Sequence, residues 1–407
     1  MKKKLLAVAV TGVLVAPAAF AQSSNVQLYG RINGGLDYYK APGATIGGVN
    51  PATDSSREGR FRVFDNSSRV GVRGTEDLGN GLKAIFQIET GVNVDSGTNT
   101  GQGGQANTST GFWGTRDTWG GLQAGWGRVT YGRQSMYWVN GVNAQFSANY
   151  INAEIPWTNG TQLGRVSDGG IVAARVSNTI QYTSPTWAGN NFTLSWSPNA
   201  QEAVQGKGSG IEPDGQIWGA TWRGTFGPVY GQLDYANVKN NALGATAAGN
   251  PTPGLTFQQK GQLYKAGVSW GYLPGARVGL IWVRTSQNLA TGLLAGQTVR
   301  KDGWTLNWEQ TFGNIQALAQ YGWTGDIKNC AAVDAVTCSN TSAKGFMLGG
   351  RYLLSKRTWL YLSYNQVTNE SNDFIDYTGG AITSVNGAPT PYGADPRVLA
   401  LGFHHNF

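Results

Sequence analysis

Residues 400–407, Ala400–Leu–Gly–Phe–His–His–Asn–Phe407, form the most informative stretch of the chain. Leu401, Phe403, His405 and Phe407 alternate with smaller or more polar residues, so one face of an extended strand would be mostly apolar and aromatic. This pattern is typical of the closing strand of a membrane-spanning β-barrel, although an ordinary amphipathic edge strand would show the same alternation. We interpret the aromatic C-terminus, Phe407, as a signal for barrel assembly.

The other end of the chain has the pattern of a secretory signal peptide. A basic segment, Met1–Lys4, precedes a short apolar run, Leu5–Val15, and Ala19–Phe–Ala21 matches a small-x-small cleavage site. The apolar run is too short to span a bilayer. We therefore predict a signal peptide in residues 1–21, cleaved after Ala21, and one exported domain in residues 22–407.

Composition narrows the class of this domain. The chain is rich in glycine, with 60 residues, and only 13% of its residues are charged. After the signal, the sequence contains no apolar stretch long enough for a transmembrane helix. A bilayer-spanning chain must pair all its backbone polar groups, so without such helices it would have to close into a barrel. A secreted all-β protein, such as an adhesin or a carbohydrate-binding protein, is the alternative.

Alternating runs separated by short and long connections recur along the whole sequence. In the first run, Val26, Leu28 and Ile32 share one face, so Arg31 must lie on the other. Long polar segments occupy residues 95–111, 240–258, 288–299 and 369–394. Short turns are expected at Asp77–Gly81, Gly125–Gly127, Phe226–Pro228, Tyr272–Gly275, Phe312–Asn314 and Ser355–Arg357. Regular alternation of short and long connections predicts an all-β, antiparallel transmembrane barrel of about sixteen strands.

The two cysteines, Cys330 and Cys338, are close in sequence. An exported chain meets an oxidising compartment, so we expect one disulfide that closes a small loop. Two unpaired thiols are the alternative. A metal site would need further ligands, and the only histidines, His404 and His405, are distant in sequence.

Six stretches in this order resemble the Gram-negative general porins of β-proteobacteria. They are Val26–Gly30, Ser68–Leu82, Gly127–Arg133, Asn178–Pro185, Leu354–Thr358 and Gly402–Phe407. The resemblance implies a sixteen-stranded homotrimeric barrel through which small hydrophilic solutes diffuse passively. It also implies that the third external loop folds into the lumen. With this family come outer-membrane lipid, including lipopolysaccharide, and the barrel-assembly machinery as expected partners, with no nucleic acid and no cofactor.

The candidate constriction loop is the long connection 134–177. It contains enough apolar side chains to pack against a barrel wall, and its only acids are Glu154 and Asp168. Of these, Glu154 is the better candidate for the constriction, because Asp168 precedes two glycines and fits a turn. Trp138 and Trp157 lie in the same loop and would form an aromatic track if the protein were a substrate-specific porin, which is the closest alternative function.

Arginines concentrate in the first third of the sequence. A charged side chain that faces lipid at mid-depth costs about 2–4 kcal/mol, which favours an inward orientation. Several arginines around a narrow pore would attract anions, so we expect weak to moderate anion selectivity. The predicted selectivity residues are Arg31, Arg69, Arg73, Arg116 and Arg133. The alternative is that some of them pair with Glu76, Asp77 or Glu89, or bind lipid headgroups, and we favour this for Arg57, Arg60 and Arg62.

The sequence gives little support for an enzyme. A hydrolase of the outer membrane needs a nucleophile with a general base, which is commonly histidine. Here His405 falls on the anchoring face of the last strand, and no Gly-x-Ser-x-Gly motif is present. We therefore predict a diffusion channel without catalytic activity.

Overall fold

A computed structural model describes residues 24–44, 57–92, 94–95, 113–136, 175–198, 216–243, 257–289, 297–330, 338–373, 375 and 392–407. The predicted signal peptide lies outside these residues, so its cleavage site stays a prediction. Among the described residues, no helix has the length and hydropathy needed to cross a bilayer.

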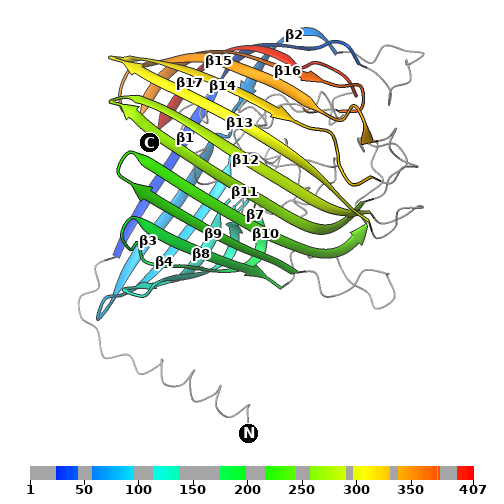
Figure 1. Ribbon diagram of the computed structural model, residues 1–407. Coiled ribbons are helices and arrows are strands. Elements are labelled where there is room, and N and C mark those ends of the chain that lie inside the picture. Colours follow the sequence, from blue (N-terminus) through cyan, green and yellow to red (C-terminus); the bar gives the residue numbers. More distant parts are fainter. Residues whose placement is uncertain are drawn as a thin grey trace.

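The described chain forms one antiparallel sheet. Its strands are β1 (Ser24–Ala41), β2 (Arg57–Asp65), β3 (Arg69–Gly79), β4 (Leu82–Gly91), β5 (Thr118–Ala124), β6 (Gly127–Ser135), β7 (Arg175–Thr183), β8 (Asn190–Ser197), β9 (Gln216–Phe226), β10 (Val229–Leu243), β11 (Phe257–Leu273), β12 (Ala276–Leu289), β13 (Thr298–Phe312), β14 (Ile315–Thr324), β15 (Ala343–Leu353), β16 (Thr358–Asn369) and β17 (Arg397–Asn406). β1 pairs with both β2 and β3, each strand from β3 onward pairs with the next, and β17 pairs with β1, so the sheet closes into a barrel (Figure 1).

Two of these segments, β2 and β3, are halves of one spanning strand. The C-terminal half of β1 pairs with β2, beginning with Gly34 opposite Asp65. The N-terminal half of β1 pairs with β3 and ends with Arg31 opposite Arg69. The strand breaks where Ser67 adopts a left-handed φ of 61°. The barrel therefore has sixteen spanning strands, and the predicted fold class is confirmed.

The alternation of side chains assigns the two faces of the wall. On β1, Leu28 and Leu36 are 61% and 56% exposed, whereas Asn33 and Asp37 between and beside them are 0% and 2% exposed. Exposed apolar side chains belong on the outer face of a membrane barrel, so the buried polar ones face the interior. This assignment confirms the two faces predicted for the first strand and places Arg31 inside.

The last strand closes the barrel as the sequence predicts. Leu401 and Phe403 are exposed on the outer face, and His404 is buried on the inner face. The backbone of Phe407 exchanges two hydrogen bonds with Gly30, with N–O distances of 3.1 and 3.2 Å. A Cβ atom at Gly30 would lie 2.4 Å from the Phe407 ring, so this position needs glycine for the ring to cover it. The assembly role of Phe407 remains a prediction.

The connections are short at one end of the barrel and long at the other. All six predicted short turns occur, and a seventh, Ser184–Gly189, joins β7 to β8. In the turns between β9 and β10 and between β13 and β14, Gly227 and Gly313 have φ angles of 57° and 58°, which side chains disfavour. At the long-loop end, Cys330 and Cys338 form the predicted disulfide.

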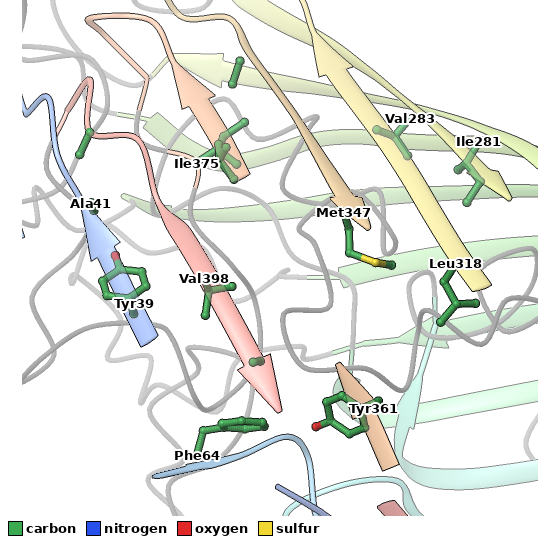
Figure 2. Close-up of a cluster of buried hydrophobic side chains, with 14 of the residues drawn as sticks. Tyr39, Ala41, Phe64, Ile281, Val283, Leu318, Met347, Tyr361, Ile375 and Val398 are labelled. Carbon is green, nitrogen blue, oxygen red and sulfur yellow. The ribbon is translucent and has the colours of Figure 1, made fainter. Parts of the chain in front are cut away.

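A group of buried apolar side chains lies on the inner face. Figure 2 shows members from β1, β12, β15, β16 and β17 together with Ile375 from the connection between β16 and β17. Ile281, Val283, Leu318 and Met347 are all at most 2% exposed. We call these four residues, on β12, β14 and β15, the apolar wall. On β13, which lies between β12 and β14, the buried inner-face residues include the polar Lys301 and Asn307.

Candidate functional site

The polar side of the interior is built on β1, β3 and β4. Register places Arg31 opposite Arg69, and Arg73 opposite Gln27, all on the inner face. The guanidinium group of Arg73 is exposed and donates to Gln27 Oε1 at 2.9 and 2.8 Å. It also lies 5.1 Å from the centre of the Tyr29 ring. Arg73 thus combines an interior position with an accessible charge.

Arg31 has a structural role at the break between β2 and β3. Its Nε donates to the carbonyl of Ser67 at 2.9 Å and its Nη2 donates to the carbonyl of Asn66 at 3.3 Å. These carbonyls lie in the irregular segment that interrupts the strand, so they have lost ladder partners. Arg31 therefore lies on the predicted face but also holds the wall together.

Glu89 on β4 is the acid that pairs with two neighbouring arginines. Its carboxylate lies 2.6 Å from Nε of Arg116 and 3.8 Å from Nε of Arg69, and accepts a hydrogen bond from the Tyr29 hydroxyl at 3.1 Å. Burial lowers the pKa of Arg116 to about 10, so this guanidinium is still charged at neutral pH. Arg69 therefore lies on the inner face as predicted and also pairs with Glu89, which was the alternative for this residue.

A second acid, Asp117, immediately precedes β5 and lies beside the ends of β6 and β7 that flank the candidate constriction loop. Its carboxylate is 2.9 Å from Nε of Arg175 and accepts hydrogen bonds from Ser135 N and Oγ at 2.7 and 2.8 Å. Burial alone would raise the pKa of Asp117, but Arg175 and these hydrogen bonds hold it below its usual range. Nearby, Arg133 donates to the Thr115 carbonyl and the Ser177 hydroxyl, at 3.3 and 3.1 Å.

The residues that form this polar side are called the arginine cluster. The cluster consists of six arginines and two acids, so its positive charge is in excess. Its members are Arg31, Arg69, Arg73, Glu89, Arg116, Asp117, Arg133 and Arg175.

The structure places the five predicted arginines on one side of the interior. It also adds residues to this group that the sequence analysis did not predict as site residues. Asp117 and Arg175 were missed because they are 58 residues apart and only the fold makes them neighbours. Strand β6 ends at Ser135 and β7 begins at Arg175, so the connection is slightly shorter than predicted. Four predicted loop residues lie outside the described residues: Trp138, Glu154, Trp157 and Asp168.

Nearer the long-loop end of the same wall, Arg62 on β2 forms an ion pair. Both its Nε and its Nη2 donate to the Asp37 carboxylate at 2.9 Å, and its guanidinium carbon lies 4.5 Å from the centre of the Tyr39 ring. A bidentate pair of this kind is geometrically specific. The expectation for Arg62 was therefore wrong in its partner, because Arg62 pairs with Asp37 on the inner face and with none of Glu76, Asp77 and Glu89.

The apolar wall lies across the interior from this cluster. In the closed ring of sixteen spanning strands, β12 is eight places from β4, and β14 is eight places from β6. These strands are therefore diametrically opposed. The six arginines of the cluster therefore lie opposite the four side chains of the apolar wall, and the buried Lys301 on β13 is paired with Asp373 at 2.8 Å. The excess charge of the cluster contributes a positive potential on its side of the interior.

Comparison with known proteins agrees with this architecture. An outer membrane porin protein of Bordetella pertussis is 34% identical over 210 residues, which are 50% of this chain and 49% of the relative. The major outer membrane protein P.IB of Neisseria gonorrhoeae is 32% identical over 209 residues, or 51% of each. The chain thus spans about half the length of these curated relatives. In three dimensions, the anion-selective porin from Comamonas acidovorans has a TM-score of 0.67 at 20% identity, over 95% of this chain and 100% of that one.

The family follows from a sequence match that is longer than the two pairwise sequence alignments. The sequence profile of Gram-negative porins matches residues 6–372. This range covers most of the barrel, whose closed antiparallel architecture agrees with the solved structure. The chain therefore belongs to the Gram-negative porin family and is a protein of the bacterial outer membrane.

Proposed function

We propose that the protein is a channel for the passive diffusion of small hydrophilic solutes, with a weak to moderate preference for anions. The observation that carries the proposal is the arginine cluster, in which only Glu89 and Asp117 offset the positive charge. Arginine stays protonated at physiological pH, so the cluster attracts anions under all conditions in which the protein works. The anion-selective porin from Comamonas acidovorans, which shares the fold, gives independent support.

The test is a measurement of ion selectivity in single channels. We expect Arg31, Arg69 and Arg73 replaced together by glutamine to lower the anion-to-cation permeability ratio, because three positive charges leave the inner face. The readout is the reversal potential in a planar bilayer under a KCl gradient. An unchanged reversal potential would overturn the selectivity assignment.

A second variant guards against misfolding. Since Arg31 holds the carbonyls of Asn66 and Ser67, the triple variant is expected to be less stable. Arg69→Gln with Arg73→Gln removes two inner charges and leaves this contact intact. We expect it to shift the reversal potential in the same direction by a smaller amount.

The proposed assembly is a homotrimer in contact with outer-membrane lipid, including lipopolysaccharide, after insertion by the barrel-assembly machinery. Its support is family membership together with the apolar outer surface, on which Val26, Leu28 and Phe403 are exposed. Light scattering of the detergent-solubilised protein would measure the mass of the complex. A monomeric mass under conditions that preserve the fold would contradict the trimer.

A further inference from the structure

A second group of polar side chains lies nearer the short-turn end of the interior. Strand register aligns inner-face residues of six consecutive strands, β6 to β11, in one row across the wall. In order around the barrel they are Arg128, Thr183, Thr193, Thr221, Asp234 and Lys265. Arg223 lies on the same face of β9, two residues beyond Thr221 toward the short turn. Two arginines thus flank a stretch of threonine hydroxyl groups.

The two arginines differ from those of the arginine cluster, each of which has a hydrogen-bond or ion-pair partner for its Nε atom. Among the described residues, neither Arg128 nor Arg223 forms an ion pair within 4.0 Å, and the Nε atoms of both are buried without a hydrogen-bond acceptor. Both side chains lie on the inner face, on strands β6 and β9, which are separated by β7 and β8. A like-charged pair with unused donors is costly unless an anion joins it.

The nearest acid in the row is already engaged. The Oδ1 of Asp234 accepts a hydrogen bond from Thr221 at 2.6 Å, and its Oδ2 lies 3.9 Å from Nζ of Lys265. Gln232 donates to the same Oδ2. The single charge of Asp234 is therefore shared with the buried Lys265, and the row as a whole is positive.

The groups between the two arginines suit an oxyanion. The hydroxyl groups of Thr183 and Thr193 lie 3.3 Å apart, directly in register between Arg128 on β6 and Thr221 on β9. A guanidinium group presents planar pairs of donors that match carboxylate or phosphate oxygens, and hydroxyl groups add donors that can rotate. These features complement a small anion with several oxygen atoms.

We propose that Arg128 and Arg223 form a second anion-binding site, at the short-turn end of the lumen, for small oxyanions such as inorganic phosphate. The site lies on a different arc of the wall from the arginine cluster. The proposal rests on the lumen being water-filled, as in the proposed function. Anions that pass the cluster would then be held once more before they leave the barrel.

The experiment measures the block of chloride current by inorganic phosphate. In a planar bilayer with KCl on both sides, phosphate is added to each side in turn. We expect a block that is stronger from one side, because the site lies near one mouth. Replacing both residues, Arg128→Gln and Arg223→Gln, should weaken the block about tenfold or more, since each charged hydrogen bond to the anion is lost.

A matched control separates the site from general charge loss. Arg284→Gln removes an arginine whose partner is Asp302 on the outer face of β12 and β13, and it should leave the block unchanged. Equal block in the wild type and the Arg128/Arg223 variant would overturn the inference. Failure of the proposed selectivity would be seen separately, as a reversal potential that does not respond to Arg69→Gln with Arg73→Gln.

A direct measurement covers the case in which no current is observed. Phosphate binding to the folded, detergent-solubilised protein can be followed by calorimetric titration. Binding that is present in the wild type and in Arg284→Gln, and lost in the Arg128/Arg223 variant, supports the site. Identical titrations for all three proteins overturn it.

Discussion

The arginine cluster and the apolar wall face each other across the same barrel but are stabilised in opposite ways. In the cluster, each buried charge depends on a partner, as Arg116 depends on Glu89 at 2.6 Å. In the apolar wall, Ile281 and Met347 are each 1% exposed and are held by contact alone. The difference teaches that the two sides of one lumen can be altered independently. Changes to the first should alter both stability and selectivity, whereas changes to the second should alter stability only.

The largest effect is expected from Glu89→Gln. Removing this acid leaves Arg116 buried without its counter-charge, and breaking a buried pair from one side costs about 3–5 kcal/mol. The free energy of unfolding should fall by about that amount in urea titrations of the refolded protein. Because a negative charge also leaves the wall, the reversal potential should move further toward anion preference.

The control for this variant is Glu76→Gln, on β3 near its short turn. Glu76 forms no ion pair within the described part of the chain, so its loss should change stability little. A shift toward cation preference in Glu89→Gln would contradict the view that excess positive charge on this wall sets selectivity.

An intermediate effect is expected from Met347→Ala on the apolar wall. Truncating a fully buried methionine removes contacts and leaves a cavity, which typically costs about 2–5 kcal/mol. The unfolding free energy should fall, and the reversal potential of the channels that do form should match the wild type. A clear change in selectivity without loss of stability would show that this wall contacts the permeating ions.

The sequence predicted the barrel because its strongest signals are local. Short turns such as Phe312–Asn314 and the alternation in Leu401 and Phe403 depend only on neighbouring residues, so they can be identified before the fold is known. The inward direction of Arg31 followed in the same way, from its apolar neighbours. Its contacts with Asn66 and Ser67 did not, because they depend on a break in a different strand.

The apolar wall shows where alternation stops being informative. In β12 the run Leu280–Ile281–Trp282–Val283 is apolar on both faces, so periodicity cannot say which side points inward. The structure buries Ile281 and Val283 and leaves Trp282 on the outer face, where it packs against Trp304 with ring centres 6.3 Å apart. The pairing of Asp117 with Arg175 was equally hidden, since nothing local links two residues so far apart in sequence.

The smallest effect is expected on the outer face, and it decides whether the position of a charge matters more than its presence. Arg284 and Asp302 lie 2.7 Å apart with side chains 33% and 16% exposed, on the face opposite to Val283. The pair lies at the long-loop end of the wall, because Asp302 is just beyond the end of β14. A partly exposed pair near an aqueous surface contributes about 0–1 kcal/mol, so Arg284→Gln should barely alter the unfolding free energy. Its reversal potential should equal that of the wild type, because the lost charge is separated from the lumen by the barrel wall. If this variant instead shifted selectivity as much as Arg73→Gln, the net charge of the whole protein would control ion preference, and the contrast between the two walls would have no functional meaning.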